Sequence, residues 1–224
     1  MATFVCIHGA GGRASQWRLV AGHLEAAGHR VLAVDLPCEE PVGLDAYRDA
    51  VVDAIGRPSD DLVLVAQSLG GFVAPLVCAR VPVDLLVLVA AMVPKPGESG
   101  AEWWDATGHR AALAAQGLAD DSAETLFTFD VPDEVLASFD PPREQTGDLF
   151  AEPWPLERWP DVPTRFLLCR DDRFFPAAWL ARIVRDRLGL EPTVIPGGHC
   201  SYLSQPLALA RALLGCWEEV RTER

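Results

Sequence analysis

The chain has 224 residues, half of them hydrophobic, and its 32 acidic and 19 basic side chains give a net charge of −13. A chain of this length and composition can bury one full core, so we expect a single domain with room for an insertion. The negative charge, without any basic cluster, excludes nucleic acid and anionic membrane surfaces as partners.

The first predicted element is a strand over residues 4–7, which leaves no room for a cleavable signal peptide before it. No apolar run reaches transmembrane length. The six cysteines are scattered without C-x-x-C spacing, which favours reduced thiols over a zinc site or a disulfide framework. We therefore expect a cytoplasmic protein that does not contact a membrane.

A glycine-rich loop, His8 to Gly12, follows this strand. Such a loop also suggests a nucleotide-binding turn, but no G-x-G-x-x-G can be read there, and Asp35 alone cannot supply that fingerprint. Glycines permit close approach of the backbone to a ligand. The loop is thus predicted to aim a backbone N–H, that of Ala10, at a developing oxyanion.

Strands and helices alternate over the next part of the chain. Spacing and apolar runs predict helices over residues 15–27 and 44–55 and strands over 31–34 and 84–91, with another strand beginning at residue 62. Strands this uniformly apolar are buried on both faces, which indicates a mostly parallel sheet with right-handed crossovers. Several serines have helix-cap or turn explanations: Ser15, Ser59, Ser201 and Ser204.

Residues 62–72 predict a strand, a sharp turn at Ser68 and a helix. Only small neighbours tolerate the strained backbone of such a turn, which accounts for Ala66 before the serine and Gly70 after it. The serine hydroxyl would project from the carboxyl edge of the sheet, facing the first N–H groups of the helix. An ordinary turn whose serine caps the helix is the alternative, because short motifs recur by accident.

Residues 93–161 interrupt the alternation. Eight prolines divide this segment into short pieces, and four of the seven tryptophans of the chain lie in it. A structureless loop of this length is uncommon in a compact domain, so we predict a small helical cap inserted after the fourth strand, its aromatic side chains lining an apolar pocket. Residues 1–92 and 162–224 would form the core.

The sheet pattern resumes with predicted strands over residues 164–169 and 193–195, and helices over 177–188 and 207–221. The pair Asp171-Asp172 follows the first of these strands, and His199 follows the second. The carboxyl edge of an open α/β sheet is where such sheets place their chemistry. Both polar groups are therefore candidate functional residues.

Ser68, an aspartate near residue 172 and His199 occur in the chain order Ser, Asp, His. That order on a parallel sheet of about six strands resembles the α/β-hydrolase fold over nearly the whole chain. The resemblance is carried by His8-Gly9-Ala10-Gly11, Ala66-Gln67-Ser68-Leu69-Gly70-Gly71, Asp172 four residues before Pro176, and Gly198-His199 followed by Leu203-Ser204-Gln205-Pro206. The Ser-Leu-Gly-Gly turn and the His…Leu-Ser-x-Pro ending look most like the small plant-type methyl esterase and hydroxynitrile lyase branch.

The resemblance implies a serine hydrolase that cleaves a small carboxylic ester through an acyl-enzyme. Ser68 would be the nucleophile, His199 the base and Asp172 the carboxylate behind it, while the N–H groups of Ala10 and Leu69 would hold the oxyanion. Asp172 fits the spacing of the family to the proline that follows. Asp171 is the alternative carboxylate, which could instead face solvent or cap the turn.

The substrate implied by the aromatic cap is a compact apolar or aromatic ester, with no metal or organic cofactor required, and both a monomer and a homodimer stay open. A hydroxynitrile lyase of the same branch would be expected to carry threonine at the position of Gly9 and lysine at that of Cys200. A receptor with slow hydrolysis, using the capped pocket to recognise a small molecule, is a third alternative. His109, in the cap, has either a substrate contact or a structural role.

Overall fold

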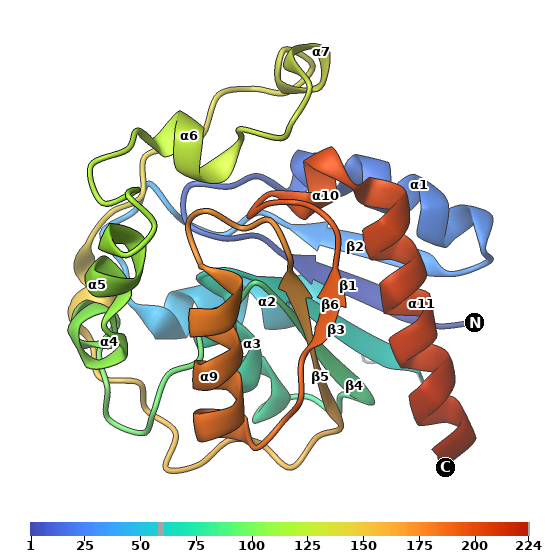
Figure 1. Cartoon of the computed structure of the whole chain (residues 1–224). Coiled ribbons are helices and arrows are strands. Elements are labelled where there is room, and N and C mark those ends of the chain that lie inside the picture. Colours follow the sequence, from blue (N-terminus) through green and yellow to red (C-terminus); the bar gives the residue numbers. More distant parts are fainter. Residues whose placement is uncertain (58–60, 224) are drawn as a thin grey trace.

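The computed structural model describes residues 1–57 and 61–223, so Ser59 lies outside the described residues. Within this part of the chain, six parallel strands form one sheet in the order β2-β1-β3-β4-β5-β6 (Figure 1). The strands are β1 (Thr3–Ile7), β2 (Arg30–Val34), β3 (Leu62–Gln67), β4 (Leu85–Val89), β5 (Thr164–Cys169) and β6 (Thr193–Ile195). The predicted α/β class and parallel sheet are confirmed.

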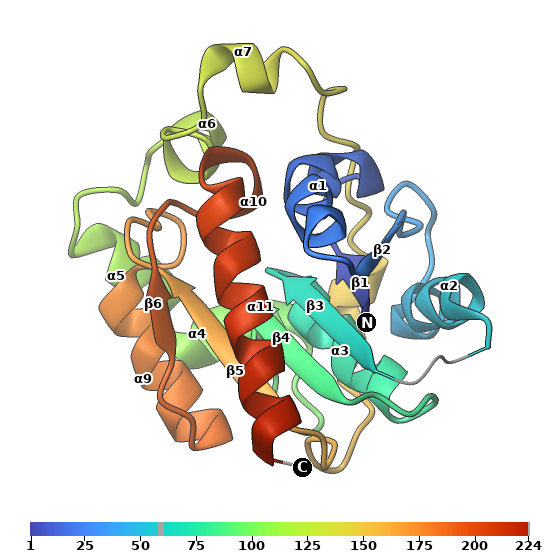
Figure 2. The ribbon, with the colours of Figure 1, turned by 90° about the vertical axis from the view of Figure 1, so that its right-hand side faces the viewer.

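Helices cover both faces of the sheet (Figure 2). One face packs against α1 (Arg18–Ala26) and α11 (Pro206–Glu223), and the other packs against α2 (Leu44–Ile55), α3 (Gly70–Cys78) and α9 (Ala177–Leu188). Alternate strand residues supply the two cores, since successive side chains of a strand point to opposite faces. Val63 and Val65 belong to the α1 and α11 side, whereas Leu64 belongs to the other.

The order of the strands brings two loops together. The chain runs from β1 outward to β2, then returns to β3 on the opposite side of β1, so the sheet changes direction between β1 and β3. Ile7 is paired with Ala66 at the carboxyl ends of these strands. The glycine loop after β1 and the turn after β3 are therefore neighbours at the switch point, where open α/β sheets bind ligands.

The structure differs from the sequence prediction at some element ends. β4 ends at Val89 rather than at Ala91, because Ala90 has a φ of +42°. The helix expected over residues 15–27 begins as a 3-10 turn, η1 (Ala14–Trp17), before α1. No helix of the described residues combines the length and the apolar character needed to cross a bilayer.

The segment 93–161, hereafter the cap segment, contains five helices in its described residues. They are α4 (Gly100–Thr107), α5 (His109–Ala114), α6 (Ala123–Phe127), α7 (Asp133–Leu136) and α8 (Asp148–Ala151). Figure 1 shows α6 and α7 beyond the edge of the sheet, above α10 (Ser201–Ser204) and α1. Its helical content agrees with the predicted cap, while the division of the chain into core and cap stays a prediction.

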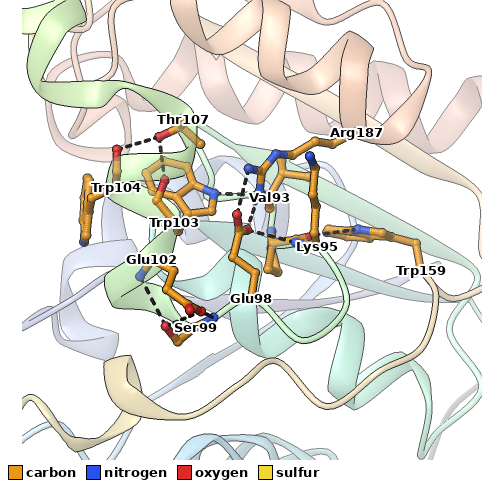
Figure 3. Close-up of polar contacts among 11 residues, drawn as sticks. Val93, Lys95, Glu98, Ser99, Glu102, Trp103, Trp104, Thr107, Trp159 and Arg187 are labelled. Atoms are coloured by element: carbon orange, nitrogen blue, oxygen red, sulfur yellow. Dashed lines mark hydrogen bonds and ion pairs between the residues drawn. The ribbon is translucent and has the colours of Figure 1, made fainter.

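Buried polar contacts attach the start of the cap segment to α9 (Figure 3). The Arg187 guanidinium and the Glu98 carboxylate form an ion pair with one N–O distance of 2.9 Å, and their side chains are only 5% and 9% exposed. Arg187 also donates to the Val93 carbonyl, which accepts a second hydrogen bond from the Trp103 indole. The first residues of the segment are thereby held to the core.

Candidate active site

Ser68 lies in a strained turn between β3 and α3. Its φ is +52°, in the left-handed region that non-glycine residues seldom adopt. The Ser68 carbonyl accepts hydrogen bonds from the N–H groups of Gly71 and Met92, which stabilise this conformation. No residue with a side chain fits at position 71, because a Cβ there would lie 1.9 Å from the Met92 carbonyl oxygen. Strained backbone of this kind clusters at functional sites, which keeps Ser68 a candidate functional residue.

The structure brings Ser68, His199 and Asp172 into one chain of hydrogen bonds. The His199 Nε2 atom lies 3.0 Å from the Ser68 Oγ atom, and its Nδ1 atom lies 2.8 Å from the Asp172 Oδ2 atom. All three residues are buried. Residues from the ends of β3, β5 and β6, up to 131 positions apart in the sequence, thus meet at the carboxyl edge of the sheet.

The geometry distinguishes the two candidate aspartates. The second oxygen of Asp172, Oδ1, accepts hydrogen bonds from the N–H groups of Phe174 and Phe175, at 2.9 and 2.8 Å, which fix the carboxylate toward the imidazole. Asp171 instead pairs with the exposed Arg170 and accepts from the Gly197 N–H, and the Arg170 hydrogen bond lowers the pKa of its carboxyl. Asp172, and not Asp171, therefore contacts His199.

Aromatic rings enclose the imidazole. The rings of Phe127, Phe174 and Phe175 lie 4.9 to 5.2 Å from that of His199 in edge-to-face arrangements. They exclude water from its sides and leave polar contacts at the two ring nitrogens. Hydrogen bonds inside such an apolar shell are electrostatically stronger than in water.

The two predicted oxyanion donors, the N–H groups of Ala10 and Leu69, belong to the neighbouring loops at the switch point, and both residues line the same cavity as Ser68. Neither N–H has a hydrogen-bond acceptor among residues 1–57 and 61–223. Leu69 is buried, and a buried donor without a partner is rare in proteins. The two groups are therefore available to an oxygen atom of a ligand.

His8 shapes the glycine loop as a neutral ring. Its Nδ1 atom lies 2.7 Å from the Gly9 carbonyl oxygen, to which it donates, while Nε2 accepts from the Leu36 N–H. Burial lowers the pKa of His8 to about 4, and the nearby guanidinium of Arg143 acts in the same direction. The ring stays uncharged and holds the loop in place.

Two neighbouring cavities lie near the serine turn, and Ser68 lines the smaller of them. The inner cavity, of about 140 Å³, is lined by Ser68, His199 and apolar side chains that include Met92, Trp104 and Phe150. The outer cavity, of about 510 Å³, lies between the α6 and α7 region and the start of α10. Five residues line both: Ala10, Gly12, Phe127, Cys200 and Tyr202. The two cavities therefore lie next to each other, separated by these shared residues.

The contacts of Cys200 and His109 indicate structural roles for both residues. Burial raises the pKa of the Cys200 thiol to about 12, so the thiol stays protonated at neutral pH and is a poor nucleophile. His109 contacts the Trp104 and Trp179 rings, and its Nε2 atom donates to the Phe174 carbonyl at 2.7 Å. His109 lines neither cavity among the described residues, so it supports the cavity wall from behind.

Sequence reasoning missed the residues of the cap segment that reach the site loops. Arg143 and Gln145 contact the glycine loop, and Asp130 accepts a hydrogen bond of 2.7 Å from the Gly198 N–H beside His199. These polar side chains lie in a proline-rich stretch far from any recognisable motif. The acidic and proline-rich composition of the segment carried no signal that would single them out.

Comparison with known proteins gives the family of this chain. The sequence model described as the Alpha/beta hydrolase family matches residues 4–212. The chain is 36% identical over 107 residues to a probable esterase, PIR7A, of Oryza sativa, and 31% identical over 145 residues to Methylesterase 3 of Arabidopsis thaliana. These matches cover 42% and 58% of this chain and 41% and 52% of the relatives, so they span about half of the relatives' own length or less.

The overall structure resembles solved structures. A crystal structure of a pyrethroid hydrolase from Sphingobium faniae JZ-2 superposes with a TM-score of 0.79 over 97% of both chains, at 24% sequence identity. A likeness at this identity shows the common fold. The two plant relatives are named as a probable esterase and a methylesterase, which agrees with the plant-type methyl esterase resemblance of the serine turn and the histidine loop.

Proposed function

The chain belongs to the α/β-hydrolase family, and we propose that it is a hydrolase that cleaves small carboxylic esters through an acyl-enzyme on Ser68. The observation that carries this proposal is the continuous set of hydrogen bonds from Ser68 through His199 to Asp172. A serine hydroxyl is nearly inert at neutral pH, and this arrangement supplies the base that activates it.

Each residue has a defined role in the proposed reaction. Ser68 Oγ attacks the ester carbonyl carbon while His199 Nε2 takes its proton, and the same nitrogen then gives that proton to the departing alkoxide. The Asp172 carboxylate holds the imidazole in the tautomer with a proton on Nδ1 and stabilises the imidazolium. A water molecule, activated by His199 in the same way, releases the acid from Ser68.

The free N–H groups of Ala10 and Leu69 support an oxyanion hole at this site. As the carbonyl carbon becomes tetrahedral, its oxygen becomes negatively charged, and fixed donors stabilise it more than they stabilise the ground state. The loss of one such donor typically costs about 3 kcal/mol of transition-state stabilisation.

The two cavities support a compact apolar or aromatic ester as substrate. The inner cavity, walled by the aromatic side chains of the cap segment, accepts one compact group beside the ester carbonyl, and the outer cavity accepts a larger group on the other side. The apolar lining of the inner cavity would select a group by shape and by burial of hydrophobic surface, whereas the outer cavity also has polar lining residues such as Gln16, Glu124 and Asp140.

Neither alternative function gains support from the site. The position where a lyase of this branch would carry threonine is Gly9, and a Cβ there would lie 2.5 Å from the Gln67 Oε1 atom and 2.8 Å from the Ser68 Cβ atom. Cys200 stands in place of the lysine, with its thiol buried. A receptor with slow hydrolysis would use the same residues, so turnover number separates it from an esterase.

The test is hydrolysis of short p-nitrophenyl esters by wild-type protein and by Ser68→Ala, with Ser15→Ala as the matched control. We expect Ser68→Ala to lower kcat on the order of 10⁴-fold or more, and Ser15→Ala to retain activity. A fluorophosphonate should label the wild-type protein once, at Ser68, as mass spectrometry of the peptide would show. Substantial turnover by Ser68→Ala would refute the proposal, and a single burst without turnover would favour the receptor.

A further inference from the structure

We propose that Arg143, assisted by Gln145, is a positioning residue for the oxyanion hole: the two side chains hold the loop from His8 to Gly12 so that the Ala10 N–H faces the inner cavity. This role rests on the proposed function of Ser68, because it concerns the same reaction. It extends that function to the cap segment, whose residues would then affect the rate as well as the choice of substrate.

Arg143 makes a dense set of contacts with the loop. Its Nε and Nη2 atoms both donate to the Gly12 carbonyl oxygen, at 2.9 and 2.8 Å, and its backbone N–H donates to the Gly11 carbonyl at 2.8 Å. Nη2 also lies 3.1 Å from the Nε2 atom of His8, whose lone pair it shares with the Leu36 N–H. The Arg143 side chain is only 10% exposed, so these charge-assisted bonds are shielded from water.

Gln145 holds the adjacent peptide from the same side. Its Oε1 atom accepts a hydrogen bond of 3.2 Å from the Gly11 N–H, and its Nε2 atom donates to the Tyr47 hydroxyl of α2 at 2.8 Å. Gly11 has a φ of +63°, and a Cβ there would lie 2.6 Å from the Arg143 carbonyl oxygen. The glycine therefore allows the cap segment to approach the loop closely enough for these bonds.

The loop has little internal support of its own. Within it, Gly12 N–H donates to the Gly9 carbonyl at 3.2 Å, and the His8 ring donates to the same oxygen. Arg143 and Gln145 of the cap segment supply four further bonds to Gly11 and Gly12. Ala10 is therefore fixed from both sides by its neighbours, and its own N–H stays free. Without the hydrogen bonds from the cap segment, the Ala10 N–H would no longer be held in one orientation. A displacement of about 1 Å at a reacting group can lower a rate about 100-fold.

The experiment compares Arg143→Ala and Arg143→Lys with Arg18→Ala. Arg18 is the matched control because it also joins the core to the cap segment, through the Ser138 carbonyl and the Phe139 ring, without touching residues 8–12. We expect Arg143→Ala to lower kcat for p-nitrophenyl acetate about 100-fold with little change in KM. Arg143→Lys keeps the charge but not the paired donors, so we expect it to recover little of the rate. Methylguanidine should partly restore Arg143→Ala.

A transition-state analogue separates positioning from general loss of structure. A trifluoromethyl ketone that adds to Ser68 places an oxyanion in the hole, so its affinity should fall by the same factor as kcat/KM. Thermal unfolding of each variant reports the folded fraction. If Arg143→Ala does not fold, Gln145→Met, which removes the acceptor of the Gly11 N–H, should show a smaller loss of the same kind.

The outcomes for the two proposals differ. Arg143 and Gln145 variants that match Arg18→Ala in kcat and in ketone affinity would overturn the positioning role, and failure of methylguanidine to restore any rate would count against it. Those results would leave the proposed function intact provided that Ser68→Ala is inactive. Full turnover by Ser68→Ala would instead refute the proposed function, and with it this role.

Discussion

The side-chain amide of Gln67 donates a hydrogen bond of 3.2 Å to the carbonyl oxygen of His199. Gln67 immediately precedes Ser68 and is only 2% exposed. The turn that carries the proposed nucleophile therefore also holds the loop that carries the proposed base. One buried side chain thus links the two groups directly.

Removal of this bond should reduce the rate without unfolding the protein. Gln67→Met keeps the approximate volume but leaves the His199 carbonyl without its donor, at a cost of about 1 to 2 kcal/mol. If most of this cost appears as misalignment of the base, kcat should fall about tenfold. Steady-state kinetics check this, with the exposed Gln116→Met as the control. An unchanged kcat would show that the loop keeps its position without Gln67.

The two adjacent aspartates should respond differently to the same substitution. Asp172→Asn retains an oxygen for the N–H groups of Phe174 and Phe175 but loses the charge beside His199, so kcat should fall on the order of 10⁴-fold. Asp171→Asn, which changes an exposed pair with Arg170, should keep most of the activity. Equal losses in both variants would contradict the assignment of Asp172.

Gly9 should not tolerate a side chain. A Cβ there would meet the Gln67 Oε1 and Ser68 Cβ atoms at 2.5 and 2.8 Å, so Gly9→Ala should displace the serine turn and remove most of the activity. Gly215 lies in α11, where a Cβ would meet no neighbouring atom within 4 Å, so Gly215→Ala should stabilise the fold by up to about 1 kcal/mol. Ester hydrolysis and urea unfolding of both variants would reveal any departure from this contrast.

The buried ion pair between Arg187 and Glu98 should matter more than an exposed pair on the same helix. Arg187→Met leaves a buried carboxylate without its partner, which should destabilise the protein by about 3 to 5 kcal/mol, and a second change, Glu98→Met, should recover much of this loss. Arg185→Met breaks an exposed pair with Glu191 and should cost no more than about 1 kcal/mol. Urea unfolding compares the four proteins, and similar effects of Arg187→Met and Arg185→Met would contradict the prediction.

Acid should destabilise the protein through His8. Because the pKa of His8 is about 4 in the folded state and near 6.5 when unfolded, the unfolded state binds more protons between these values. The contribution of His8 to stability is thus complete above pH 6.5 and is lost as the pH falls through 4. Between pH 7.5 and 5.0 the loss should be about 2 kcal/mol.

The control for this pH dependence is His8→Asn, which removes the titrating ring. Burial also lowers the pKa values of His29 and His109, but these contributions are present in both proteins and cancel in the comparison. Urea unfolding at the two pH values measures the difference. Equal slopes with pH in the wild-type and variant proteins would exclude His8 as the source.

The local sequence was sufficient to predict the parallel sheet and the polar residues at its carboxyl edge. Uniformly apolar strands and the small residues around Ser68 have few other structural explanations. Because the carboxyl ends of parallel strands lie at one edge of the sheet, the loops of His199 and of an aspartate were expected beside the serine. The choice between Asp171 and Asp172 came from spacing in a family pattern, and the contacts of the structure support it.

Contacts of the cap segment could not be predicted in this way. Arg143 and Gly12 are 131 positions apart, and neither the periodicity nor the composition of the intervening chain indicates which polar residue of the segment turns inward. The end of β4 was also placed too late, because Ala90 has a positive φ that the identity of an alanine does not indicate.

The contacts that the cap segment makes with the core limit how a new specificity could be engineered. Besides Arg143, Asp130 holds the loop of His199, and Glu152 accepts a hydrogen bond from the first N–H of α2, at Leu44. A chimera that exchanged the entire segment with that of a relative would lose these attachments together with the cavity wall. Libraries restricted to wall positions such as Trp104 and Phe150, with the attachment points retained, would let substrate preference evolve while the reacting groups keep their places.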